Sequence, residues 1–239
     1  MNLLNINYKY LFNGSWIRHL PGGKISLGKN VKIKNSNIFV NSNAILRIGD
    51  NVRIENANIY VGQGSLTLNE CVIIQSSNHE KATITIDNGI CRIDDHSRIS
   101  CRRIWIRFGG SLSIGSYTNI NSGSEIRCDE RISIGSFNQI SYNINIWDTN
   151  THSILPTDQR RQLTIDKYPS FGYEIARPIT KPIFIGDDCW IGENATIFKG
   201  TSIGNGSIIG YGTFLSGKSI PSNSRVTCRR DLTIDIISH

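Results

Sequence analysis

The pattern of apolar positions is most regular between Ile185 and Ser219. Along this stretch an aliphatic residue recurs at every sixth position, and a small residue stands four places after each one. The aliphatic positions are Ile185, Ile191, Ile197, Ile203, Ile209 and Leu215, and the small ones are Cys189, Ala195, Thr201, Ser207, Thr213 and Ser219. A helix needs apolar spacing near 3.6 and a half-buried strand needs about 2. A strict period of six instead predicts a parallel β-helix.

The same pattern extends toward the N-terminus in a less regular form. An aliphatic residue followed by Gly, Asn or Asp returns in steps of 21, 20, 25, 21, 20, 51 and 18 residues, at Leu27, Ile48, Leu68, Ile93, Ile114, Ile134, Ile185 and Ile203. Three hexads make an 18-residue coil, so most steps are one coil with two or three extra residues at a corner. The 25-residue step places a bulge at Ser76–Lys81. We therefore expect an all-β chain of about eight or nine coils, with a helix considered only after Pro221.

Two segments lie outside this repeat. Residues 1–24 contain Tyr8, Tyr10, Phe12 and Trp16, and they are expected to cap the first coil. The 51-residue step leaves a long polar insert, 152–184, which starts at His152. A loop longer than ~15 residues in a compact domain is usually functional or disordered, and attachment at both ends to a rigid coil favours function. The predicted domains are a cap (1–24), a β-helix (25–220) interrupted by the insert, and a tail (221–239).

Composition narrows the compartment and the ligands. The chain has 239 residues and a net charge of +7, which suits anionic ligands or serves solubility alone. No apolar run approaches the ~20 residues of a membrane span, and the N-terminus lacks the pattern of a signal peptide. The six cysteines form no CxxC pair, and Cys189 occupies an inward small position. These features predict a cytoplasmic protein with reduced cysteines.

Three motifs carry a resemblance to a known family. They are the opening of the insert, DTNTHS (148–153), the run KPIFIGDDCWIGENATI (181–197), and IGYGTFLSGKSIP (209–221). With the hexads, they resemble the hexapeptide-repeat acyltransferases, in the branch of sugar O-acetyltransferases and xenobiotic acetyltransferases. The likeness is strong over 112–222 and weaker over 25–111. It implies a left-handed parallel β-helix, acetyl-CoA as co-substrate without a metal, and a homotrimer with sites between subunits.

The resemblance marks His152 as the catalytic residue. A sugar hydroxyl is a poor nucleophile near neutral pH, and a base with a pKa close to 7 can remove its proton during attack on a thioester. Asp148, four residues earlier, either fixes the tautomer of His152 or is a solvated corner residue. Asn121 stands beside Gly123, the position that aligns with a helper Asn in the family, and its other interpretation is a stacked Asn ladder.

The remaining candidate residues would bind the two substrates. The candidates for the acceptor sugar are Trp147, Trp190, Arg160, Arg161 and Tyr173. Those that the resemblance assigns to acetyl-CoA are Gly192, Glu193, Gly210, Tyr211, Gly212, Ser216 and Lys218. The family usually continues with a Gly-x-Pro-x-Lys/Arg segment, whereas this chain has VTCRRDL, so Arg229 and Arg230 are substitutes by position only.

These features predict an acetyl-CoA-dependent O-acetyltransferase that acts on a sugar hydroxyl of capsular or another surface polysaccharide. The closest alternative is an antibiotic O-acetyltransferase, which shares the long inserted loop. Two alternatives of other classes are a non-catalytic β-helix scaffold and a metal-dependent hydrase. The hydrase would need His79, His96 and His152, whose spacings are not multiples of a coil.

Overall fold

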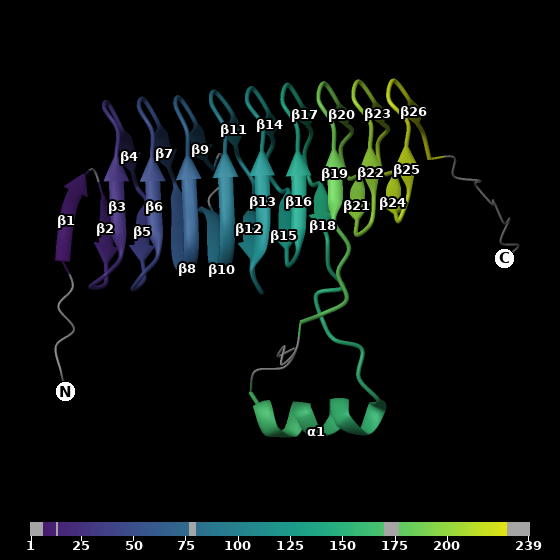
Figure 1. The fold of residues 1–239 in the computed structure, drawn as a ribbon, viewed down its shortest axis with the longest axis horizontal. Coiled ribbons are helices and arrows are strands. Elements are labelled where there is room, and N and C mark those ends of the chain that lie inside the picture. Colours follow the sequence, from purple (N-terminus) through teal and green to yellow (C-terminus); the bar gives the residue numbers. More distant parts are fainter. Residues whose placement is uncertain (1–6, 13, 77–79, 170–176, 229–239) are drawn as a thin grey trace, which may run out of the picture.

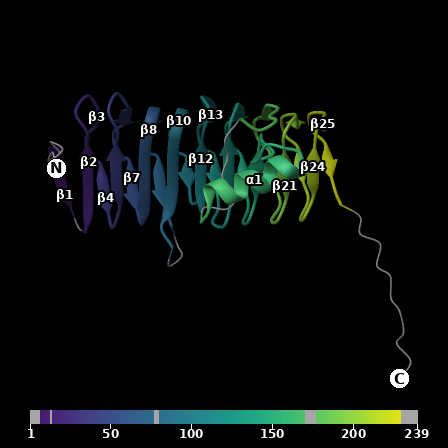
Figure 2. The ribbon, with the colours of Figure 1, turned by 90° about the horizontal axis from the view of Figure 1, so that it is seen from below.

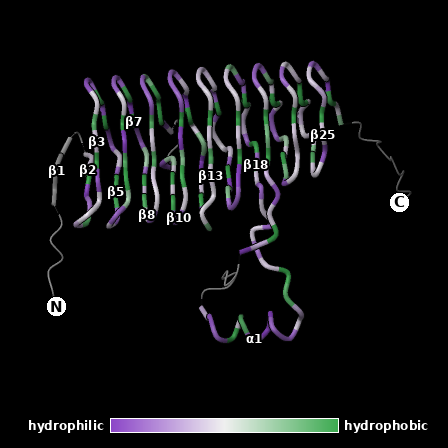
Figure 3. The backbone as a smooth tube through the Cα atoms, in the orientation of Figure 1, coloured by the Kyte–Doolittle hydropathy of each residue, from purple (hydrophilic) through white to green (hydrophobic). Residues whose placement is uncertain are grey.

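The computed structural model describes residues 7–12, 14–76, 80–169 and 177–228. The chain winds into a parallel β-solenoid, and Figure 1 shows the coils stacked side by side from the N-terminal to the C-terminal end. Apolar and polar residues alternate along each coil (Figure 3). Buried Ile, Leu and Val side chains form one continuous core along the inside. This all-β fold is the predicted one, and it is consistent with the left-handed β-helix that the family resemblance implies.

Each coil contributes strands to three faces, which we call faces 1, 2 and 3. Face 1 contains β3 (Lys24–Leu27), β6 (Ile45–Ile48), the C-terminal halves of β8 (Ala57–Leu68) and β10 (Ala82–Ile93), β13 (Gly110–Ile114), β16 (Arg131–Ile134), β19 (Ile183–Ile185), β22 (Ser202–Ile203) and β25 (Ser219–Ile220). Face 2 contains β4 (Lys32–Lys34), β7 (Arg53–Glu55), β9 (Ile73–Gln75), β11 (Arg98–Ile99), β14 (Asn119–Ile120), β17 (Gln139–Ile140), β20 (Trp190–Ile191), β23 (Ile208–Ile209) and β26 (Arg225–Val226). Face 3 contains β2 (Ser15–His19), β5 (Asn37–Val40), the N-terminal halves of β8 and β10, β12 (Arg103–Ile106), β15 (Glu125–Cys128), β18 (Asn145–Trp147), β21 (Thr196–Phe198) and β24 (Phe214–Ser216).

The register of face 1 confirms the predicted repeat. All eight marker residues pair in one ladder, which starts at Leu27 opposite Ile48 and ends at Ile203 opposite Ile220. Within the described residues each face stacks nine strands, in agreement with the expected eight or nine coils. The six aliphatic residues of the 185–219 stretch are at most 5% exposed. The extra residues of the 25-residue step lie between β9 and β10, as predicted.

Close stacking of the coils explains why Gly follows the aliphatic marker. A Cβ atom on Gly135 would lie 2.7 Å from the carbonyl carbon of Gly186, in the next coil. A Cβ atom on Gly186 would lie 2.8 Å from the backbone nitrogen of Asn205, one coil further on. Backbone cannot yield as a flexible side chain can. The glycines of this corner are therefore requirements of packing between successive coils.

Two terminal expectations differ from the structure. Residues 15–24, expected to belong to a cap, already take part in the solenoid, because β2 pairs in parallel with β5. The strand β1 (Asn7–Phe12) runs antiparallel to β2 at this end. At the other end Ser219 is exposed and does not occupy the predicted inward position, because the step from Ile203 to Ile220 is one residue shorter than a regular coil. The described part of the tail forms the strand β26 and no helix.

The insert joins the end of β18 to the start of β19, and it contains a helix that the sequence pattern did not predict. This helix, α1 (Thr157–Lys167), has no buried residue, so the apolar periodicity that reveals helices against a core is absent from it. Figure 1 shows α1 apart from the stacked coils, and Figure 2, which looks from that side, shows it in front of them. No helix within the described ranges has the length and apolar character needed to cross a bilayer.

Candidate functional site

The root of the insert is a short two-stranded connection fixed to the corner between faces 3 and 1. Thr149 and Thr180 form an antiparallel bridge. The backbone N–H of Asn150 donates to the carbonyl of Ile179 over 3.1 Å, and that of Lys181 donates to the carbonyl of Asp148 over 3.0 Å. The outgoing and returning chains are therefore held together. His152 lies two residues after Asn150, and its side chain is exposed.

An arginine and a tryptophan lie next to His152 on face 3. Arg127 donates through Nη1 to the hydroxyl of Thr151, over 3.3 Å, and Thr151 is the residue directly before His152. The guanidinium carbon of Arg127 lies 4.3 Å from the centroid of the Trp147 ring. Thr151 has a φ of 73°, and its backbone N–H donates to the hydroxyl of Thr149. Arg127 thus joins the start of the insert to the aromatic surface of face 3.

Glu125 holds this arginine in place. Its carboxylate is buried and accepts hydrogen bonds from three guanidinium groups, those of Arg102, Arg103 and Arg127. The Nε atoms of Arg103 and Arg127 lie 2.8 and 2.5 Å from Oε1. Burial disfavours the charge of Glu125, but the hydrogen bonds from Arg127 and Arg103 outweigh it, so its pKa lies below the ordinary value. Glu125 and the three arginines together carry two more positive charges than negative ones.

Asp148 is fully buried under the root of the insert. Its two carboxylate oxygens accept backbone N–H groups of Asp129, Glu130 and Arg131 over 2.8, 2.9 and 2.8 Å. Burial raises the pKa of Asp148, and these backbone hydrogen bonds act in the opposite direction. The expectation of a solvated corner residue was wrong, since Asp148 fixes the corner of the preceding coil. A role for Asp148 in fixing the tautomer of His152 stays a prediction.

The two candidate tryptophans lie on different faces. Trp147 lies on face 3 beside Arg127, and its ring centroid is 6.5 Å from that of Phe198 in the next coil. Its indole Nε1 is buried and has no hydrogen-bond partner in the part of the chain that the structure describes. Trp190 is 58% exposed on face 2, which does not adjoin the corner of the insert. Through Arg127, the structure therefore connects Trp147, but not Trp190, to the start of the insert.

Asn121 is likewise separated from His152 in a single chain. Asn121 follows β14 at the corner between faces 2 and 3, and its Oδ1 accepts hydrogen bonds from Arg98 and Asn119. The width of face 3 separates this corner from the insert. Arg160 and Arg161 are exposed on α1. Tyr173 lies outside the described residues, as do Arg229 and Arg230.

The residues assigned to acetyl-CoA line two edges of face 3 in the last coils. At one edge the backbone N–H of Gly212 donates to the carbonyl of Glu193 over 2.9 Å, and Tyr211 next to it is 65% exposed. Gly192 and Gly210 lie at the same edge. At the other edge Ser216 and Lys218 are both exposed. A Cβ atom on Gly192 would lie 2.8 Å from the backbone nitrogen of Tyr211, so stacking of the coils already requires this glycine.

Comparison with known families settles what kind of repeat this is. Residues 182–216 match the family model described as the hexapeptide repeat of succinyl-transferase. These residues carry a hexapeptide repeat, in agreement with the six-residue period of the sequence. No curated protein matches its sequence.

Three solved structures resemble this hexapeptide-repeat protein. The polySia-specific acetyltransferase NeuO is 23% identical, with 84% of this chain and 76% of that chain covered and a TM-score of 0.48. The polysialic acid O-acetyltransferase OatWY is 20% identical, with coverage of 90% and 92% and a TM-score of 0.46. A hexapeptide-repeat-containing acetyltransferase from Vibrio cholerae is 26% identical, with coverage of 54% and 64% and a TM-score of 0.40.

The histidines of the hydrase alternative can be placed in part. His79 lies outside the described residues. His96 lies at the corner between faces 1 and 2, where its ring stacks on Tyr117 at 4.9 Å, whereas His152 lies at the corner between faces 3 and 1. The fold thus places His96 and His152 at different corners of the solenoid. The described residues contain no group of three metal-ligating side chains.

Sequence reasoning missed the arginine cluster around Glu125 and a buried ion pair nearby. Arg107 and Asp129 form two hydrogen bonds of 2.8 and 2.6 Å, and both side chains are buried. A usable signal was present in the runs RRIWIRF (102–108) and EIRC (125–128), where charged and aromatic residues alternate with buried ones. Such alternation places them together on the outside of face 3. The pairing register, which joins these runs, is not visible in the sequence.

Proposed function

We propose that this protein transfers the acetyl group of acetyl-CoA to a hydroxyl of a sugar, with His152 as the general base. The matched repeat model, described for a succinyl-transferase, supports acyl transfer. The observation that carries the proposal is the root of the insert, where the exposed His152 directly follows Thr151, the residue that Arg127 connects to Trp147 at a corner of the solenoid.

In the proposed reaction His152 removes the proton of the acceptor hydroxyl while the oxygen attacks the thioester carbon. The C–O bond forms, the C–S bond then breaks, and the imidazolium of His152 returns the proton to the departing thiolate. The products are the O-acetyl sugar and CoA. No covalent enzyme intermediate is needed, because one imidazole both accepts and donates the proton. An unpaired backbone N–H of the adjoining coil would stabilise the developing oxyanion.

The surroundings of His152 suit a sugar that carries negative charge. Three guanidinium groups surround the single carboxylate of Glu125, so the cluster has positive charge in excess. Trp147 is partly exposed, and the outer face of its ring offers an apolar surface for a pyranose. We propose a capsular or another surface polysaccharide as the acceptor.

We propose a homotrimer with the sites between neighbouring solenoids, as the family resemblance implies. In such an assembly Glu193, Tyr211, Ser216 and Lys218 of one subunit would contact the CoA that reacts at His152 of a neighbour. All four side chains are exposed in the single chain and free to meet a second subunit or a ligand. Light scattering measures the mass directly, and a monomer at assay concentration would contradict this part of the proposal.

The test replaces His152 by Ala and measures release of CoA thiol with a panel of acceptors. We expect transfer to fall by a factor of ~10²–10⁴, while the melting temperature and the affinity for CoA stay unchanged. The matched control is His96→Ala, which removes a histidine at another corner and should retain activity. Normal activity of His152→Ala would refute the mechanism. Activity on antibiotic acceptors and on none of the glycans would favour the xenobiotic alternative.

A further inference from the structure

A ladder of outward-facing residues runs along the whole of face 3. The register places them in successive coils at the same position of the strand. In chain order they are Arg18, Phe39, Tyr60, Thr85, Trp105, Arg127, Trp147, Phe198 and Ser216, and we call them the face-3 ladder. Five of the nine are aromatic and two are arginines. The ladder passes beside His152 at Arg127 and Trp147.

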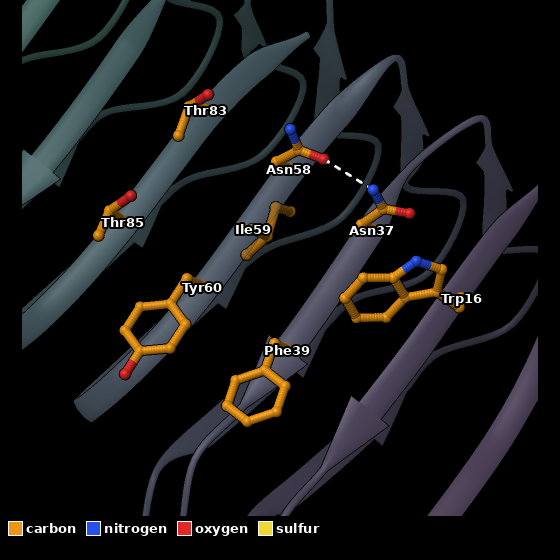
Figure 4. Close-up of a pocket in the computed structure, with 8 residues that line it drawn as sticks. All are labelled: Trp16, Asn37, Phe39, Asn58, Ile59, Tyr60, Thr83 and Thr85. Atoms are coloured by element: carbon orange, nitrogen blue, oxygen red, sulfur yellow. Dashed lines mark hydrogen bonds between the residues drawn. The ribbon is translucent and has the colours of Figure 1, made fainter.

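The N-terminal half of this face contains a shallow groove of about 380 Å³. Its lining includes Trp16, Phe39 and Tyr60, with Asn37 and Asn58 on the same strands as Phe39 and Tyr60 and Thr85 on the next strand (Figure 4). The ring centroids of Phe39 and Tyr60 are 5.7 Å apart, and the two rings are nearly parallel, with an interplanar angle of 3°. Tyr60 is 36% exposed. The groove therefore offers flat apolar surfaces with amide and hydroxyl groups alongside.

These groups match the chemistry of a sugar chain. A pyranose has an apolar face that packs on an aromatic ring, and hydroxyl groups around its rim that pair with amides and hydroxyls. In the groove Asn37 donates to Asn58 over 3.0 Å, which orients both amides along the direction in which the coils stack. Successive rungs of the ladder are ~4.8 Å apart, a spacing close to the length of one sugar unit in an extended glycan.

Charge along the same face favours an acidic chain. Arg18 lies at the N-terminal end of the ladder, where its guanidinium stacks 4.6 Å from the Trp16 centroid. Arg103 and Arg127, further along, are 5.0 and 5.8 Å from the Trp105 centroid. A guanidinium stacked on an aromatic ring keeps donors at its edge for carboxylates. The face thus combines stacking surfaces and positive charge over its length.

We propose that face 3 is a binding track for an extended acidic glycan, which leads from the groove at Phe39 and Tyr60 to His152. This inference rests on the proposed transferase function, and it specifies a polymeric acceptor. Tyr60 and Trp147 are four rungs apart, or about 19 Å at the spacing of stacked strands. Only a chain of several sugars spans that length, so binding at the groove discriminates by chain length.

The test introduces a charge at position 85, because Thr85 lies in the groove and outside the catalytic corner. Binding of the full chain is measured to polysialic acid, hyaluronan and polygalacturonate, each as long polymer and as short oligosaccharide, with dextran as the neutral polymer. We expect at least one acidic polymer to bind at least about tenfold more tightly than its own oligosaccharide. Thr85→Glu should weaken this binding about fivefold, and Thr85→Lys should strengthen it by a similar factor.

Two further variants separate stacking from folding. Tyr60→Ala should weaken binding of the long polymer about tenfold and leave the oligosaccharide unaffected. The matched control, Tyr117→Ala, removes an exposed aromatic ring from another corner and should change neither. Equal effects of Tyr60→Ala and Tyr117→Ala, or no acidic polymer preferred over its oligosaccharide, would overturn the proposal.

The remaining outcomes are equally decisive. A change of mass in Thr85→Glu without a change in glycan binding would overturn the track and make face 3 an interface between copies of the chain. Length-dependent binding without acetyl transfer to any acceptor would retain the track and refute the proposed function. Acetyl transfer that depends on His152, but not on the length of the acceptor glycan or on the charge at position 85, would support the proposed function and refute the track.

Discussion

Replacement of Glu125 by Gln tests whether one buried carboxylate holds the arginine cluster beside the candidate site. The change keeps the shape of the side chain and removes the negative charge that three guanidinium groups share. Removal of one partner from a buried ion pair costs about 3–5 kcal/mol. Arg102 and Arg103 are 52% and 31% exposed and can regain water, whereas Arg127 is 16% exposed. We therefore expect a loss of about 2–3 kcal/mol at pH 7.

The pH dependence of this loss has a definite sign. The pKa of Glu125 in the folded protein lies below its ordinary value of 4.5. A carboxyl group of this kind stabilises the fold above its unfolded pKa, and the stabilisation is lost as the pH falls through the folded pKa. The difference between the wild type and Glu125→Gln should therefore be full at pH 7 and shrink as the pH falls below 4.5.

The measurement is urea unfolding followed by circular dichroism, at one protein concentration and several pH values. The control is Asp94→Asn, which breaks the exposed pair between Arg92 and Asp94 and should cost less than about 1 kcal/mol. A loss in Glu125→Gln that stays the same from pH 7 down to about pH 3 would refute the reasoning, because it would not depend on ionisation. A loss no larger than that of the control would do the same.

Four further substitutions test the solenoid and its corners by the free energy of unfolding. Gly135→Ala should cost at least about 1–3 kcal/mol, because its Cβ atom meets the backbone of Gly186 at 2.7 Å, and an unchanged value would contradict the packing. Ile197→Ala, fully buried, should cost about 2–5 kcal/mol, and Ile208→Ala, 40% exposed, much less. Asp148→Asn should cost about 2–4 kcal/mol, because an amide cannot accept all three backbone hydrogen bonds, and wild-type stability would show that Asp148 does not hold the corner.

The repeat, and with it the core, could be predicted from the sequence. A β-solenoid is built from local turns and from strands that stack on the coil before, so the period of Ile185, Ile191 and Ile197 carries the architecture directly. The same logic identified the insert, because a rigid repeat makes any excess length visible. It missed α1, since a helix without a buried side leaves no apolar period. It also misplaced the N-terminal boundary, because β2 lies before Leu27, the first aliphatic marker of the repeat.

Which side chains meet on the surface depends on how the coils stack, and the sequence pattern does not contain this information. Trp147 and Trp190 look alike in the sequence, yet Trp147 lies on face 3, where the insert begins, and Trp190 lies on face 2. The cluster of Arg102, Arg103 and Arg127 forms because two coils pair with an excess of four residues over a regular coil, and no periodicity reports that register. Coils of unequal length bring together residues at irregular distances in the chain. A periodic sequence therefore predicts the strands and the core of the solenoid. The stacking of the coils determines which side chains lie next to each other on its surface.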